Sequence, residues 1–239
     1  MAETTYEILY WPAWRAYADV ARLILELGCA DYTNDFIIFA ESYKIKPFQR
    51  FGKTPRLTIK EEDGSVKYIW ESRAINEYLA AKLGFLPHGD EYARADVMSY
   101  VHSLNELAEA MNFIGIIPNL DDRRSYWTKL HDATIPDALE YHERAVAGPF
   151  YGGTSLTLPD IVLYALVQRM RSMFSDADGW FFNASKTPKL AALVESCDKG
   201  TMGGVVRGWA SARNPGWASF RFDAESMSWT IDISSVGQA

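Results

Sequence analysis

The hydrophobic pattern of this chain changes character near residue 85. Before that point, short apolar runs typical of strands alternate with helical patterns; beyond it, long helical patterns take over. A chain of 239 residues can bury a sizeable core without disulfides or metals. The change of pattern predicts two domains: residues 1–84 with strands and helices, and residues 92–239, all-helical with an extended C-terminal tail, joined by a linker at 85–91.

The first domain is expected to have the order strand, helix, strand, a connection, then two strands and a helix. Its strands are predicted at 6–11, 35–39, 56–59 and 66–70, and its helices at 14–28 and 72–84. Asp63-Gly64 is a strong turn signal between the last two strands. This order is typical of the thioredoxin-like fold, an α/β architecture.

The second domain is predicted to hold helices at 92–113, 121–147, 158–174 and 187–197. Thr157 and Asp160 have the spacing of a capping box, in which two residues at a helix start satisfy each other's backbone donors. We therefore interpret this pair as structural. The alternation in FRFDAESMSWTIDI suggests extended segments that fold back over a domain face.

Composition excludes several classes of function. The chain has 24 Lys and Arg against 31 Asp and Glu, a net charge of −7, and no basic block, which argues against nucleic acid and membranes as partners. Its two cysteines, Cys29 and Cys197, are far apart, which argues against a disulfide framework or a zinc site. The histidines show no metal-ligand spacing, so no metal is expected. Without a signal-peptide or membrane-span pattern, a cytoplasmic location is predicted.

Four segments carry motifs in a fixed order. They are YEILYWPAWRAYADVARLILELG, IKPFQRFGKTPRLTI, WESRAINEYLA and SLTLPDIVLYALV. Together they resemble the cytosolic glutathione transferases, and most of all their tyrosine-type branch, which contains the sigma, mu, pi and alpha classes. The resemblance covers most of the chain. It implies a thioredoxin-like glutathione-binding domain followed by an all-helical domain that binds the acceptor substrate.

The resemblance implies a set of residues that hold glutathione as co-substrate, namely Lys46, Lys53, Thr54, Pro55, Glu71 and Ser72. A cis bond before the proline would turn the Thr54 backbone outward, where it can pair with the peptide. The start of a helix at Ser72 can hold the γ-glutamyl carboxylate, and Glu71 can meet the neighbouring amine. The two lysines suit the glycyl carboxylate.

Tyr10 matches the family's catalytic tyrosine at the end of the first strand. A thiol with a pKa of about 8.5 is mostly protonated at neutral pH, whereas the thiolate is the nucleophile. A phenol that donates to the sulfur contributes about 1.5–3 kcal/mol, enough to lower the thiol pKa by roughly one to two units. Tyr6 and Tyr17 compete for this role, Tyr6 more as a packing residue and Tyr17 from the first turn of the helix.

The chain departs from the family pattern beside Tyr10. The usual Gly-Arg-Ala reads Ala16-Tyr17-Ala18, so the arginine that often lies near the sulfur is missing or is replaced by Arg15. Trp14 is a candidate wall of the acceptor pocket. In many family members an acidic residue of the partner subunit reaches the γ-glutamyl amine, and Glu106 and Asp96 are the candidates for that position.

The sequence therefore predicts a homodimeric, detoxifying glutathione transferase that conjugates the glutathione thiolate to hydrophobic electrophiles. Two alternatives stay open. One is a glutathione-dependent isomerase or peroxidase with a dedicated substrate. The other is a non-catalytic protein that keeps the glutathione-binding fold and carries a ligand.

Overall fold

The computed structural model describes the chain in several stretches, with gaps between them. The described residues are 3–11, 13–14, 17–37, 42–173, 177–180, 182, 184–210, 218–223 and 226–232.

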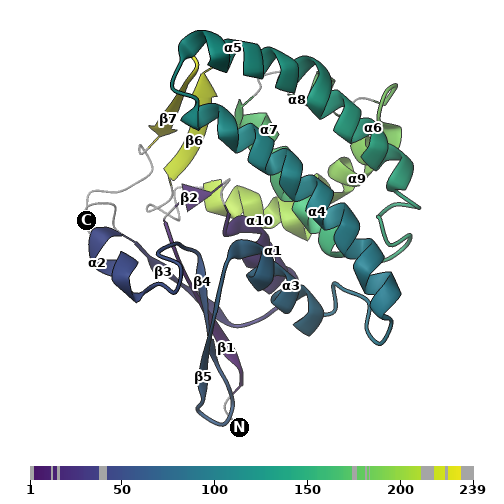
Figure 1. Ribbon diagram of the computed structural model, residues 1–239. Helices are drawn as coiled ribbons and strands as arrows, with labels where there is room; N and C mark the ends of the chain where they lie inside the picture. The colour runs from purple at the N-terminus through teal and green to yellow at the C-terminus, as the bar shows by residue number, and fades with distance from the viewer. Residues whose placement is uncertain are drawn as a thin grey trace.

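The N-terminal part is built on a four-stranded mixed sheet (Figure 1). Its strands stand in the order β3-β1-β4-β5 and are β1 (Thr5–Tyr10), β3 (Tyr32–Phe36), β4 (Arg56–Lys60) and β5 (Val66–Trp70). β1 runs parallel to β3 and antiparallel to β4, and β4 pairs antiparallel with β5. Alternate residues of β1 and β4, such as Ile8 and Leu57, fill the core beneath the helices.

Two helices pack between this sheet and the helical part of the molecule. α1 (Asp19–Leu27) and α3 (Ser72–Lys82) pack against each other, and α1 also contacts α7 of the helical part. Figure 1 shows both helices between the sheet and the long α4. A short α2 (Ser42–Ile45) and a 3-10 turn (Lys46–Phe48) lie between β3 and β4.

The C-terminal part is a helical bundle around α4 and α7. Its elements are α4 (Glu91–Phe113), a 3-10 turn (Ile114–Ile116), α5 (Leu120–Lys129), a π-helical turn (Leu130–Thr134), α6 (Ile135–Ala145), α7 (Leu158–Met173), α8 (Ala177–Trp180), α9 (Pro188–Lys199) and α10 (Thr201–Ala210). α7 lies at the centre and contacts α4, α9 and α1. The predicted fold class, a thioredoxin-like domain followed by a helical domain, is confirmed. The predicted division of the chain into domains at 1–84 and 92–239, with a linker at 85–91, stays a proposal.

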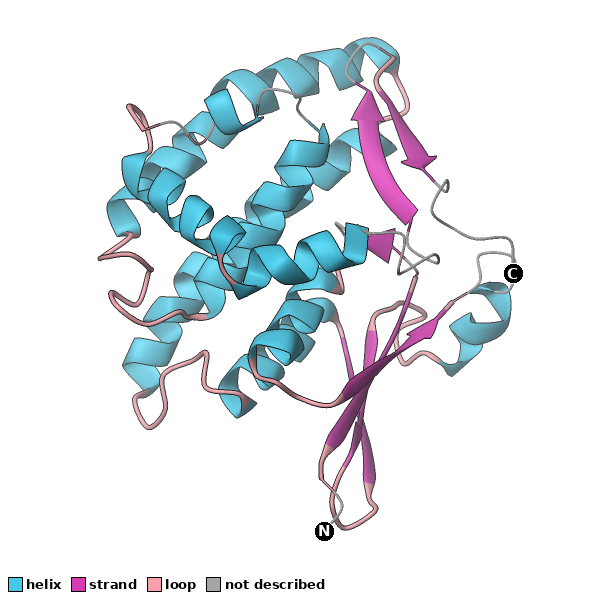
Figure 2. Ribbon diagram, turned by 180° about the vertical axis from the view of Figure 1, so that it is seen from behind, coloured by secondary structure: helices cyan, strands magenta, loops and turns pink. Residues whose placement is uncertain are grey.

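The C-terminal tail returns to the N-terminal half of the chain. β6 (Ala218–Asp223) and β7 (Ser228–Asp232) form an antiparallel hairpin, and β6 pairs in parallel with the two-residue β2 (Ala13–Trp14). In the view from behind, this hairpin lies at the edge of the helical part (Figure 2). The Arg123 guanidinium of α5 donates to the Met227 carbonyl and so fixes the hairpin turn. The expectation of extended tail segments is confirmed.

Three predicted boundaries were wrong, each because of a tertiary constraint. The first helix begins at Asp19 instead of at residue 14, because Ala13–Trp14 pairs with β6. The second strand is Tyr32–Phe36 instead of 35–39, because pairing with β1, more than apolar content, decides which residues form the strand. The helix predicted at 121–147 is broken by the π turn, just before Pro136, which has no N–H to continue the ladder.

One helix was missed because of its glycines, which disfavour helices. α10 contains Gly203, at which a Cβ would lie 2.0 Å from the Asp198 carbonyl oxygen of α9. The glycine is therefore required by the close approach of these two backbones.

Asp160 secures the start of α7, as predicted, but in a different arrangement. Its carboxylate accepts the Thr157 N–H at 2.7 Å, which is one half of a capping box. The Thr157 hydroxyl donates to the same carboxylate at 2.8 Å instead of accepting from a helix N–H. The other carboxylate oxygen accepts the Tyr151 N–H at 2.9 Å. Asp160, itself fully buried, is thus the centre of a network of three hydrogen bonds.

Candidate active site

A cavity of about 580 Å³ opens where the N-terminal part meets α4 and α7. One wall comes from the loop before β4 and from the start of α3, and the opposite wall comes from the two long helices. The cavity is lined by Tyr17, Val20, Lys53, Thr54, Pro55, Glu71, Ser72, Arg73, Ala74, Asn76, Leu104, Asn105, Ala108, Glu109, Val162, Ala165, Leu166 and Arg169.

The N-terminal wall contains five of the six predicted glutathione residues, all except Lys46. Lys53, Thr54 and Pro55 lead directly into β4, and the Thr54–Pro55 bond is cis. Lys53 is exposed, whereas Pro55 is buried. The Lys53 side chain and the Thr54 backbone therefore belong to the same loop at the cavity wall.

The first turn of α3 also faces the cavity. Ser72, Arg73 and Ala74 are its first three residues and all line the wall. Their backbone N–H groups have no acceptor within the helix, which makes a helix start a favourable place for an anion. Glu71 precedes them at φ 70° and ψ 122°, a conformation that costs a non-glycine residue about 1–3 kcal/mol. Strained residues cluster at binding sites, so the conformation of Glu71 is consistent with a binding role.

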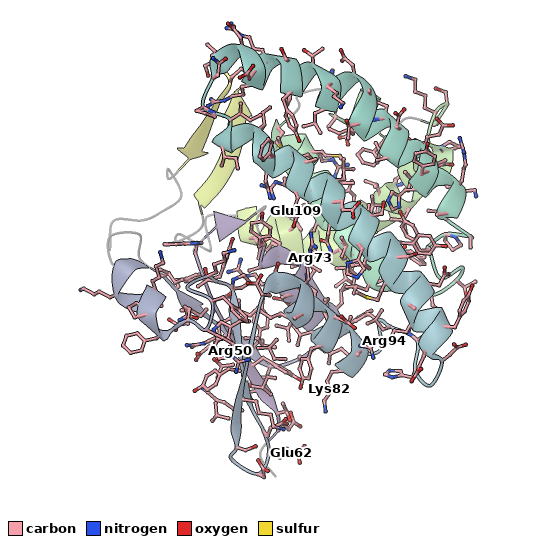
Figure 3. The ribbon with its side chains drawn as sticks, in the orientation of Figure 1. Arg50, Glu62, Arg73, Lys82, Arg94 and Glu109 are labelled. Atoms are coloured by element: carbon pink, nitrogen blue, oxygen red, sulfur yellow. The ribbon has the colours of Figure 1, made fainter. Side chains whose placement is uncertain are left out.

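An ion pair links the two parts of the molecule at the edge of the cavity. The Arg73 guanidinium of α3 donates to the Glu109 carboxylate of α4. Figure 3 shows these two side chains reaching toward each other from adjacent helices. A second bridge joins Arg94 and Glu77 at 2.7 Å farther along the same helices. The charges of Arg73 and Glu109 are therefore largely neutralised by each other.

The helical wall is mainly apolar. Leu104 and Ala108 of α4 line it together with Val162, Ala165 and Leu166 of α7, which packs against α4. Such a wall offers a surface for an apolar molecule beside the polar N-terminal wall.

The two candidate tyrosines occupy different positions. Tyr10 is 5% exposed, and its ring lies 5.9 Å from the Arg22 guanidinium carbon. Burial raises the pKa of Tyr10 to about 12, although a hydrogen bond from the Tyr17 backbone acts in the opposite direction. Tyr10 is not among the described residues that line the cavity. Because its pKa is about 12, the phenol of Tyr10 stays protonated and neutral near pH 7.

Tyr17 lines the cavity directly and is 46% exposed. Its phenolic oxygen accepts a hydrogen bond from the Asn112 side-chain amide of α4 at 2.6 Å. Tyr6, the third candidate, starts β1 in the core and does not line the cavity. Of the described tyrosines, Tyr17 is thus the one that contributes to the cavity wall.

The remaining predicted residues do not meet at the cavity. Lys46 and Glu106 are exposed and do not line it. For Trp14 the structure describes only the backbone, within β2, and Arg15 lies outside the described residues. The part of the chain that the structure describes contains no cluster of His, Cys, Asp or Glu that could hold a metal ion. None of its helices is both long and apolar enough to cross a bilayer.

Sequence reasoning missed several polar residues of the cavity, namely Arg73, Asn76, Asn105, Glu109 and Arg169. Asn76 of α3 is buried, and its side-chain oxygen has no hydrogen-bond partner in the part of the chain that the structure describes. Arg169 of α7 lies on the same helix face as Val162, Ala165 and Leu166. The spacing of these four residues, three or four apart within the helix predicted at 158–174, was the available signal, because it places them on one helix face.

The chain was compared with known proteins. No family model matches it. Among curated proteins, it is 29% identical over 170 residues to "Probable glutathione S-transferase 6" of Caenorhabditis elegans, covering 68% of this chain and 79% of the relative. It is 25% identical over 162 residues to "Glutathione S-transferase class-mu 28 kDa isozyme" of Schistosoma bovis, covering 66% and 76%.

A solved structure shares the fold over nearly its full length. The "Fasciola hepatica sigma class GST" aligns with a TM-score of 0.72 at 17% identity, covering 88% of this chain and 99% of that one. This likeness establishes the architecture, and the curated relatives add the sequence relationship. In sequence and in fold, the chain is therefore similar to glutathione transferases.

Proposed function

We propose that this protein is a glutathione transferase that joins the sulfur of glutathione to hydrophobic electrophiles. The observation that carries the proposal is the cavity with two unlike walls. Its N-terminal wall combines Lys53, Thr54, Glu71 and the start of α3, groups suited to a charged peptide. Its helical wall is mainly apolar. Holding a thiol and an electrophile side by side converts a reaction between two solutes into one within a complex.

The proposed binding follows the charges of glutathione. The γ-glutamyl carboxylate is placed at Ser72, where the helix start supplies N–H donors, and Glu71 meets the adjacent ammonium group. The glycyl carboxylate is placed near Lys53, with Lys46 as an outer partner. Thr54 pairs with the peptide backbone.

The proposed thiolate stabiliser is the neutral phenol of Tyr10. Its pKa of about 12 keeps the hydroxyl proton available for donation. Arg169, which lines the cavity, lies within electrostatic range of both Tyr10 and Tyr17, so both phenols are near this end of the cavity. Tyr17 is the competing donor because it lines the cavity itself.

We further propose a cytoplasmic homodimer that detoxifies reactive compounds. Support for an interface comes from large apolar side chains exposed on the N-terminal part, with Phe48 at 78% and Phe51 at 57%. Light scattering coupled to size exclusion measures the mass, and a mass near 27.0 kDa, that of a single chain, would exclude the dimer.

The binding part of the proposal is tested by calorimetry with glutathione. Ser72→Ala is expected to weaken binding about tenfold, the loss of one charge-assisted hydrogen bond of about 1.4 kcal/mol. Ser99→Ala, at an exposed serine of α4 outside the cavity, is the matched control and should bind like the wild type. Absence of glutathione binding by the wild-type protein would disprove the proposed function.

The catalytic part is tested with 1-chloro-2,4-dinitrobenzene as acceptor. In this reaction the thiolate sulfur bonds to the ring carbon, chloride leaves and the thiol proton passes to solvent. Tyr10→Phe is expected to lower kcat/KM about 10- to 100-fold through loss of the hydrogen bond to the thiolate. A large loss in Tyr17→Phe with little in Tyr10→Phe would move the role to Tyr17. Glutathione binding without turnover by the wild type would favour a non-catalytic carrier.

A further inference from the structure

Arg169 is a cation on the α7 side of the cavity, where the other lining residues of α7 are apolar. It follows Val162, Ala165 and Leu166 on one face of α7, so the face that meets the cavity runs from apolar to positively charged. Arg73, the other arginine of the cavity, belongs to the opposite wall and is paired with Glu109. The two arginines are therefore not equivalent.

The Arg169 guanidinium has no hydrogen-bond or salt-bridge partner among the residues that the structure describes. Its Nε atom is inaccessible to solvent and donates to no acceptor. Burial lowers the pKa of this guanidinium, which reflects the unfavourable loss of hydration. The arginine is half-buried and lines the cavity, so its charge is only partly hydrated and is placed to receive an anion that enters from outside.

The surrounding charges do not supply that anion. The carboxylate that acts on Arg169 electrostatically is Asp19 of α1, and it already forms an ion pair with Arg22 at 3.3 Å. Two guanidinium groups therefore share one carboxylate. The nearby Tyr10 and Tyr17 are phenols that contribute polar oxygen but no full negative charge. Among the described residues, Arg169 therefore has no carboxylate of its own at this end of the cavity.

We propose that Arg169 determines the acceptor class, selecting electrophiles with an apolar body and an anionic group such as a carboxylate or sulfonate. The apolar body lies along Val162, Ala165 and Leu166, and the anion meets the guanidinium. This inference rests on the proposed function, because it names the second substrate of the same cavity. Arg169 is unassigned in the glutathione contacts proposed above.

Binding tests the inference without any catalysis. The probes are 8-anilinonaphthalene-1-sulfonate and N-phenyl-1-naphthylamine, which share a ring system and differ in the sulfonate. Arg169→Met is expected to weaken binding of the sulfonate at least about tenfold and that of the neutral probe less than about twofold. Arg169→Lys should restore part of the loss. Arg124→Met, which removes an exposed arginine of α5 outside the cavity, is the control for net charge.

Turnover tests the same selectivity with 4-chloro-3,5-dinitrobenzoate and its neutral amide. Arg169→Met should lower kcat/KM for the carboxylate at least about tenfold and leave the amide nearly unchanged. Equal losses for both acceptors would overturn the inference, since Arg169 would then act on the sulfur or on the fold. No loss for either would overturn it as well. A wild type that binds the sulfonate through Arg169 but binds no glutathione would refute the proposed function and retain the anion site.

Discussion

The side-chain amide of Asn112 donates a hydrogen bond to the phenolic oxygen of Tyr17 at 2.6 Å, across the boundary between the N-terminal part and α4. Because the oxygen acts as acceptor in this bond, the phenol's own proton stays available for a ligand. Tyr17 precedes α1, whereas Asn112 lies in the last turn of α4. The orientation of Tyr17 at the cavity therefore depends on a residue that does not line it.

Removal of Asn112 should reduce activity more than stability. Asn112→Ala leaves the half-exposed Tyr17 free to rotate, so we expect kcat/KM for 1-chloro-2,4-dinitrobenzene to fall about three- to tenfold, with a stability change below about 1 kcal/mol. The measurement is a double-mutant cycle with Tyr17→Phe, combining kinetics and urea unfolding. Because both variants break one contact, their effects should not add. Full additivity would show that the hydrogen bond does not position Tyr17.

Tyr10 should titrate far above the exposed tyrosines. Burial raises its pKa to about 12, against about 10 in the unfolded chain. Tyrosinate absorbance of the wild type minus that of Tyr10→Phe should therefore show no ionisation below about pH 11. Since the folded pKa is the higher one, this group's contribution to stability is complete below pH 10 and is lost as the pH rises toward 12. A difference titration centred near pH 10 would contradict the buried position of the phenol.

The sequence predicted most of the N-terminal fold because local signals agree with tertiary structure there. The turn at Asp63-Gly64 and the strand 66–70 are as expected, and Gly64 has a positive φ of 82°. The register of β3 could not be predicted, since pairing with β1 sets it. The parallel contact of β2 with β6 joins segments about 200 residues apart and leaves no local signal in the sequence.

The candidate site was predictable on one wall only. Its N-terminal wall is made by contiguous motifs, such as Lys53-Thr54-Pro55 and Glu71-Ser72, which can be recognised along the chain. Arg169 is brought to the cavity by the packing of α7 against α4 and α1. A single arginine within a helical stripe looks like many solvated arginines until its place on the cavity wall is known, together with the lack of an acceptor for its Nε atom among the described residues.

His142 should make stability depend on pH in the acidic range. Burial lowers its pKa to about 4, and its ring nitrogens contact the Tyr151 hydroxyl at 2.7 Å and the Ser103 hydroxyl at 3.2 Å. Because the unfolded chain takes up the proton near pH 6.5 and the folded chain does not, stability is lost as the pH falls from 6.5 toward 4. The loss between pH 7 and 4.5 is expected to be on the order of 2–3 kcal/mol.

Urea unfolding of the wild type and His142→Gln at both pH values isolates this contribution. The glutamine variant lacks the titrating ring, so its stability should decline less over the same interval. His88→Gln, at an exposed histidine of the linker, should follow the wild type. Parallel pH dependence in the wild type and His142→Gln would show that other groups control acid stability.

Asp160 should be required for folding and dispensable for glutathione binding. Its carboxylate is fully buried, does not line the cavity, and accepts the Tyr151 N–H, the Thr157 N–H and the Thr157 hydroxyl. Asp160→Ala would leave these buried donors unpaired, at an expected cost of about 3–5 kcal/mol. Asp90→Ala removes the exposed N-cap of α4, where one N–H is accepted at 2.9 Å, and should cost about 1 kcal/mol.

Urea unfolding measures the stability loss of both variants. Calorimetry on the folded fraction of Asp160→Ala should give a glutathione Kd within about twofold of the wild type, since the cavity wall is intact. A stability loss no larger than that of Asp90→Ala, or a weakened Kd with normal stability, would show that Asp160 acts at the site instead of at the start of α7.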